Sequence, residues 1–146
     1  MSIADAITMA REVKPIETTD ELKEAVARFL PRGSENKVLA QIFQALRIEV
    51  NEEMKVLEAF LSQCADVLNP GGRLVVLSYH SLEDRLVKNF MKTGNADGNL
   101  EKDFFGNQLT PYKLMTSKPI IPTDEEIQMN SRARSAKLRV AERRVK

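Results

Sequence analysis

The stretch SYHSLEDR, residues 78–85, brings together side chains that could carry acid–base or hydrogen-bonding chemistry. It holds His80, the only histidine of the chain, followed by Glu83 and Asp84. Histidine is the side chain most often used to move protons, so His80 is a candidate catalytic residue. A lone histidine at a helix start is more often a structural hydrogen-bonding residue. The two acids fall in the first turn of a predicted helix, where carboxylates favour the helix dipole.

Other chemistry is poorly supported by the residue types. One histidine and one cysteine are too few for the usual transition-metal sites, and no Gly-rich phosphate loop is present, so we predict no metal. The double glycine Gly71-Gly72 lies at the wrong end of a predicted strand for a phosphate cradle, and a tight turn explains it. Cys64 falls on the apolar side of a helical pattern, so we expect a core residue.

Basic residues are concentrated near the C-terminus. From Asn130 onward there are seven Lys or Arg and one Glu, a charge of +6, which leaves −5 for the rest of a chain whose net charge is +1. Such an asymmetry is typical of contact with a polyanion such as RNA, although a solvated charged tail remains open.

A predicted alternation of helices and strands positions these residues. We predict helices over 2–13, 18–30, 39–68, 81–92 and 122–129, and strands over 73–79, 112–120 and 138–144. The third helix has a mean apolar spacing of about 3.6 residues and a possible kink near Asn51. We expect N-caps at Ser2, Thr18, Ser81 and Thr123. The strand over 73–79 is apolar on both faces, which favours a covered sheet, and the last strand should be antiparallel.

The rim of the predicted sheet is the natural place for a site. In an open α/β sheet, ligands bind at the carboxyl ends of strands, and SYHS lies where the strand over 73–79 ends. His80 and Ser81 therefore lie at this rim, beside the unpaired N–H groups that begin the next helix.

Three stretches resemble one family when taken together: FQALRIEVNEEM, PGGRLVVLSYHSLEDRLVKNF and NSRARSAKLRVAER. They are similar to consecutive signatures of the bacterial S-adenosylmethionine-dependent 16S ribosomal RNA cytosine-N4 methyltransferases, the RsmH or MraW type. The resemblance spans roughly residues 36–143. It implies an α/β fold, namely the C-terminal part of a class I, Rossmann-like methyltransferase sheet (strands five, seven and six) with flanking helices. Residues 1–35 would end an inserted helical domain, and residues 36–146 would belong to the methyltransferase domain.

The family's cofactor loop and its ribose-binding acid would precede everything in this sequence. The resemblance therefore implies the C-terminal half of the enzyme, with no cofactor-binding residue in this chain and S-adenosylmethionine bound only by the full-length protein. Alone, the chain should be inactive. Its apolar strand over 73–79 should lie on an open sheet edge, which predicts self-association.

Three groups of residues could face 16S ribosomal RNA. They are Gln44, Arg47 and Asn51 on the long helix, Ser78 and Ser81 beside His80, and Arg132, Arg134, Ser135 and Lys137 in the basic segment. A solvated helix face is the alternative for the first group, and internal ion pairing is the alternative for the last.

Two other interpretations remain. The chain could be a non-catalytic module that binds RNA or protein through its basic end, or a structural fragment that is stable only with a missing half. No apolar run approaches the roughly 18 residues of a membrane span, and the N-terminus has no signal pattern. We therefore expect no membrane association and a cytoplasmic location.

Overall fold

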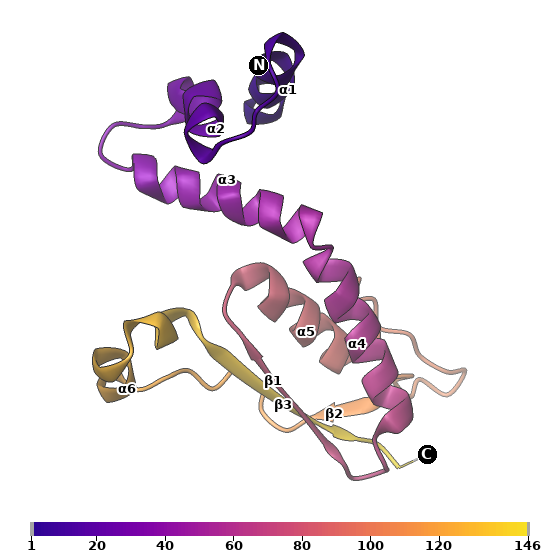
Figure 1. Ribbon diagram of the computed structural model, residues 1–146. Helices are drawn as coiled ribbons and strands as arrows, with labels where there is room; N and C mark the ends of the chain where they lie inside the picture. The colour runs from indigo at the N-terminus through magenta and orange to yellow at the C-terminus, as the bar shows by residue number, and fades with distance from the viewer. Residues whose placement is uncertain (1, 146) are drawn as a thin grey trace. The chain divides into compact units, whose positions relative to one another are not determined.

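The computed structural model describes residues 2–145. The chain divides into two compact units, Met1–Asn51 and Glu52–Lys146. The first unit is helical and the second combines helices with a sheet, as labelled in Figure 1.

The helical unit holds α1 (Ile3–Val13), α2 (Thr19–Val26), a 3-10 turn η1 (Ala27–Phe29) and α3 (Glu35–Val50). Ser2 and Thr18 cap α1 and α2 as predicted, each within a capping box that satisfies two backbone N–H groups. The centre of the unit is apolar and is formed by Val26, Leu39 and Ile42.

The predicted third helix is interrupted at the expected kink, and the interruption is a complete break. Helix α3 ends at Val50 and α4 (Glu53–Val67) begins after Glu52. Glu52 has φ 51° and ψ 34°, a left-handed conformation that no helix interior allows and that side-chain-bearing residues rarely adopt. The apolar periodicity runs through this position because both helices bury one face.

The second unit is a three-stranded antiparallel sheet with two helices packed on it. Its elements are α4, β1 (Arg73–Ser78), α5 (Ser81–Thr93), β2 (Tyr112–Leu114), α6 (Asp124–Met129), a 3-10 turn η2 (Ser131–Ser135) and β3 (Lys137–Arg143). The strand order is β1-β3-β2, so the last strand lies in the middle and is antiparallel to both neighbours, as predicted (Figure 1).

The core of this unit lies between the sheet and the helices α4 and α5. Its members are Leu61, Cys64, Leu74, Val87, Phe90, Met91, Tyr112 and Ala141. Cys64 is buried there, and burial raises the pKa of its thiol, which agrees with the predicted core role. The turn at Gly71-Gly72 is also as predicted. Gly71 has φ 81°, and its N–H donates to the Arg143 carbonyl at 2.8 Å.

Two predictions about the strands are wrong. The strand over 112–120 ends at Leu114 and rejoins the sheet only as an isolated bridge at Ile120. The bridge does not extend backward into a ladder, because the preceding Pro119 has no N–H to donate. Strand β1 is not covered on both faces. Val75 and Leu77 are 54% and 50% exposed, because among residues 2–145 the helices α4 and α5 cover only the opposite face.

Candidate functional site

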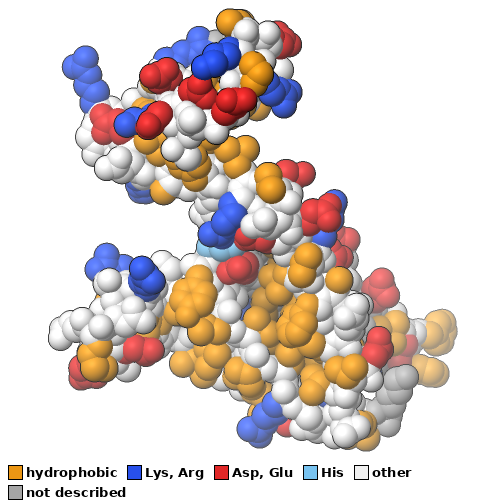
Figure 2. Space-filling model, viewed as in Figure 1, with side chains coloured by type: hydrophobic (Ala, Val, Ile, Leu, Met, Phe, Trp, Pro, Cys, Tyr) orange, Lys and Arg blue, Asp and Glu red, His pale blue; other side chains and the backbone are white. Residues whose placement is uncertain are grey.

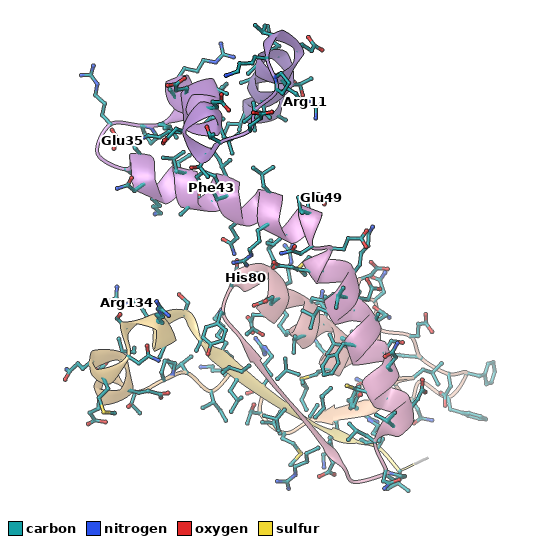
Figure 3. The ribbon with its side chains drawn as sticks, in the orientation of Figure 1. Arg11, Glu35, Phe43, Glu49, His80 and Arg134 are labelled. Carbon is teal, nitrogen blue, oxygen red and sulfur yellow. The ribbon has the colours of Figure 1, made fainter. Side chains whose placement is uncertain are left out.

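The carboxyl end of β1 runs directly into α5, and His80 caps that helix. Nδ1 of His80 accepts a hydrogen bond from the Glu83 backbone N–H at 3.3 Å. The Glu83 carboxylate reaches back and accepts from the backbone N–H groups of Tyr79 and His80, at 3.0 and 3.3 Å. Figure 3 shows His80 at the start of α5. The prediction that Ser81 is the cap is wrong, because Ser81 is already the first helical residue and lies exposed.

Two polar atoms at this rim are buried without a hydrogen-bond partner. They are Ser78 Oγ and His80 Nε2; within residues 2–145 only Tyr112 Oη shares this state. Ser78 is 2% exposed, and the His80 side chain is 14% exposed. Glu83 Oε1 lies 3.3 Å from His80 Nε2, close enough for an ion pair with a protonated imidazole, but the two atoms form no hydrogen bond. Buried polar atoms are normally satisfied, so these two atoms are exceptions among the described residues.

A buried ion pair ties the first turn of α5 to the middle strand. Asp84 Oδ1 accepts from Arg139 Nε at 2.6 Å, and Oδ2 accepts from Arg139 Nη2 at 3.2 Å. Lys137 Nζ lies 3.3 Å from the same Oδ2. Burial alone would raise the pKa of Asp84, but hydrogen bonds and charges from Arg139 and Lys137 outweigh it and hold the pKa below its ordinary value.

The basic segment is divided between inward and outward roles. Lys137 contacts Asp84 and is half-buried, which is the internal ion pairing considered for this segment. Arg132, Arg134 and Ser135 lie exposed on η2, and neither arginine makes an ion pair within the described part of the chain. Figure 2 shows basic side chains gathered over this turn, and Figure 3 labels Arg134. The outward arginines are therefore available to a phosphate backbone.

The three long-helix candidates belong to the helical unit. Gln44 is half-buried on α3, Arg47 is exposed, and Asn51 caps the C-terminal end of that helix. Their spacing of three and four residues places them along one side of α3.

Sequence reasoning missed one feature of the rim, the pairing of Asp84 with Arg139. Arg139 occupies an inward position of β3, where it lies opposite Val76. The buried Ala141, two residues further along the strand, is on the same face. The sequence does contain a signal for this pair. Arg139 is a charged residue at an inward position of an alternating strand, and such a residue requires a buried partner of opposite charge.

A shallow pocket of about 300 Å³ lies on the other face of the sheet, beside the same strand end. Its walls include Leu77, Tyr79, Ile121 and Leu138, with Asn130 at its margin. No cluster of three potential metal ligands occurs among residues 2–145, and no helix in that range is long and apolar enough to cross a membrane.

Comparison with known proteins identifies the protein family to which the chain belongs. Residues 1–144 match the model of the MraW methylase family, and the chain belongs to that family. The relatives it resembles include "Ribosomal RNA small subunit methyltransferase H" of Parabacteroides distasonis, 56% identical over 141 residues, which are 97% of this chain and 46% of the relative. The protein of the same name from Flavobacterium psychrophilum is 58% identical over 144 residues, 99% of this chain and 49% of that relative. The chain thus spans about half the length of the relatives it matches.

Proposed function

We propose that this chain is the C-terminal part of an enzyme that methylates the exocyclic amine (N4) of a cytosine in 16S ribosomal RNA. The carrying observation is the family match over residues 1–144, together with relatives named as ribosomal RNA small subunit methyltransferases. In this proposal β1, β3 and β2 are strands five, seven and six of a class I, Rossmann-like methyltransferase sheet. Residues 1–35 end the inserted helical domain, and residues 36–146 belong to the methyltransferase domain.

S-adenosylmethionine would supply an electrophilic methyl group, but residues 2–145 hold no glycine-rich turn at the carboxyl end of a strand that would fit it. Ligands of open α/β sheets bind at the carboxyl ends of strands. The only double glycine forms a turn at the amino end of β1, where Gly71 is hydrogen-bonded to Arg143. We therefore assign cofactor binding to the part of the whole-length enzyme outside this chain, and we expect the isolated chain to be inactive.

The contribution of this chain is to hold the RNA. The target base must leave its stack to be modified. We propose that Ser78, His80 and Ser81 contact this base, and that Arg132, Arg134 and Ser135 bind neighbouring phosphates. Lys137 is shared between Asp84 and the RNA. Gln44, Arg47 and Asn51 present a second RNA-facing surface from the helical unit.

The partner in this proposal is the small ribosomal subunit, and the location is the cytoplasm, where ribosomes are assembled. The chain taken alone should also self-associate. Among residues 2–145, strand β1 pairs with β3 alone, so its other edge leaves backbone groups available to another strand.

A second candidate is a non-catalytic RNA-binding module. The exposed arginines of η2 favour it. Unlike the methyltransferase, such a module would not bind a methyl donor even as part of the whole-length protein.

Cofactor calorimetry on two proteins separates the candidates. The first protein is the isolated chain. The second, called the hybrid here, is the Parabacteroides distasonis protein with its matching segment replaced by this chain. We expect S-adenosylmethionine to bind the hybrid and not the isolated chain. Tight binding by the isolated chain would refute the half-enzyme proposal, and a folded hybrid without binding would favour the module.

A further inference from the structure

We propose that His80 acts as a neutral hydrogen-bond donor, through Nε2–H, to an acceptor of the target cytosine, either the ring nitrogen N3 or the carbonyl oxygen O2. Ser78 Oγ binds the same base. This inference rests on the proposed function and defines the role of His80 within it: the residue positions the base, and it does not remove the proton from the reacting amine.

The cap of α5 determines which imidazole nitrogen carries the proton. Nδ1 accepts the Glu83 backbone N–H, so Nδ1 must be unprotonated. An imidazole with an unprotonated Nδ1 carries its hydrogen on Nε2. Nε2 is then a donor with no lone pair to accept a proton, and acting as a base through Nδ1 would break the helix cap.

The Nε2 donor makes no hydrogen bond within residues 2–145. Nε2 is buried, and the carboxylate oxygen beside it, Glu83 Oε1, lies 3.3 Å away without forming a hydrogen bond. The other oxygen of Glu83 is used by the backbone N–H groups of Tyr79 and His80. A buried N–H that is left unsatisfied costs free energy, so an incoming acceptor gains both the bond and the removal of that cost.

Ser78 provides a second group on the same side of the chain. Residues two apart in an extended segment point to the same face, so Ser78 and His80 share one side of the strand end. The Ser78 hydroxyl is buried, has no partner, and can donate or accept. A pyrimidine edge offers donors and acceptors together, which a simple anion does not.

The ion pair beneath the rim keeps the donor in place. Asp84 lies in the first turn of α5, and its N–H donates to the His80 carbonyl at 3.1 Å. Because Arg139 fixes the Asp84 carboxylate to β3, the helix start cannot rotate freely. A donor fixed before the substrate arrives loses little conformational entropy on binding.

The single histidine makes the protonation state directly measurable. In the chain labelled with ¹⁵N-histidine, one imidazole is present, and its nitrogen shifts distinguish the two neutral forms. We expect hydrogen on Nε2 and an unprotonated, hydrogen-bonded Nδ1 in slightly alkaline buffer. A hydrogen on Nδ1 would overturn the inference, whatever the outcome for the proposed function.

Two substitutions separate capping from donation. His80→Asn keeps a strong N-cap acceptor and deletes the Nε2 donor. His80→Gln can place an amide N–H near the position of Nε2 but caps poorly. In the hybrid, we expect His80→Asn to keep its melting temperature and to lose methyl transfer about tenfold to a hundredfold, the size of one unmade hydrogen bond. His80→Gln should melt lower and retain more transfer than His80→Asn.

The outcomes separate this inference from the proposed function. If the unmodified hybrid folds and transfers no methyl group to small ribosomal subunits, the proposed function fails, and the imidazole measurement still decides the protonation state. If the unmodified hybrid is active and His80→Asn matches it in both kcat and KM, His80 is only a helix cap and the inference is wrong.

Discussion

Arg139 Nε lies 2.6 Å from Asp84 Oδ1, and the two side chains are almost completely buried. They come from β3 and from the first turn of α5, which are more than fifty residues apart in the sequence. The pair thus fastens the helix that carries His80 to the middle strand of the sheet. A buried pair of this kind is most costly to break when one partner is removed, because the other charge is left uncompensated.

Asp84→Asn should lower the free energy of unfolding by about 3 kcal/mol, because Arg139 would stay buried without a counter-charge. Urea denaturation of the isolated chain measures the change. Asp97→Asn, at an exposed loop acid, is the matched control and should stay within about 0.5 kcal/mol of the parent. Equal effects of the two substitutions would mean that the ion pair does not hold the fold.

The stabilisation by Asp84 should disappear in acid. Because folding lowers the pKa of this carboxyl below 3.8, its contribution is complete above that pH and is lost as the pH falls through the lower folded value. The difference in unfolding free energy between the parent and Asp84→Asn should therefore shrink below about pH 4. The partly exposed Glu21, whose pKa is lowered to about 2 mainly by its hydrogen bond with Lys14, is present in both proteins, so its contribution cancels in the difference. A difference that is the same at about pH 3 and about pH 7 would contradict this account.

Arg134→Ala in the hybrid should weaken RNA binding and reduce the slope of log affinity against log salt by about 1, since one phosphate contact is lost. Stability should hardly change, because Arg134 is exposed and makes no ion pair within residues 2–145. Lys137→Ala is the comparison. Its ammonium group contacts Asp84, so we expect a larger loss of stability and a smaller change in the salt slope. Unfolding of Arg134→Ala with an unchanged slope would assign Arg134 an internal role.

Glu52 offers a test of backbone strain between α3 and α4. It is the only residue other than glycine with positive φ among those described. Glu52→Gly and Glu52→Ala both remove the exposed ion pair with Lys55, so their difference isolates the backbone. We expect the glycine variant to be more stable by about 1 kcal/mol, the reverse of the order in a helix interior. Calorimetric melting of both variants gives the comparison, and a more stable alanine variant would show that residue 52 is helical in solution.

Self-association through the open edge of β1 can be tested by light scattering at micromolar concentration. We expect the parent chain to be larger than a monomer, and Val75→Lys to shift it toward monomer, because a charge on an edge strand discourages pairing. Val75 is 54% exposed, so lysine fits there, and Val67→Lys on α4 serves as an exposed control. A clean parent monomer would show that the edge does not recruit a second chain.

The sequence predicted those parts of the fold that follow from local rules. The N-caps at Ser2 and Thr18, the Gly71 turn and the central antiparallel last strand all come from patterns within a few residues or from the family resemblance. The cap of α5 was misplaced by one residue, because histidine is a rarer cap than the serine beside it.

The remaining features depend on long-range packing. The sequence predicts a helix-dipole role for Asp84, because its place in the first helical turn explains an acid locally. Its partners Arg139 and Lys137 approach only when β3 pairs with β1. The exposure of one face of β1 could not be predicted either. The strand has apolar residues on both sides, a pattern that predicts a covered strand, but residues 2–145 cover only one side.

The proposed role of this chain, as the RNA-binding half of a cytosine-N4 methyltransferase, can be tested by nucleoside mass analysis of 16S ribosomal RNA. Unmodified small subunits are incubated with S-adenosylmethionine and either the hybrid or the isolated chain. We predict one added methyl group on the N4 amine of a cytosine with the hybrid and none with the isolated chain. A folded, cofactor-binding hybrid that leaves every cytosine unmodified, or that methylates a ring carbon, would contradict the account.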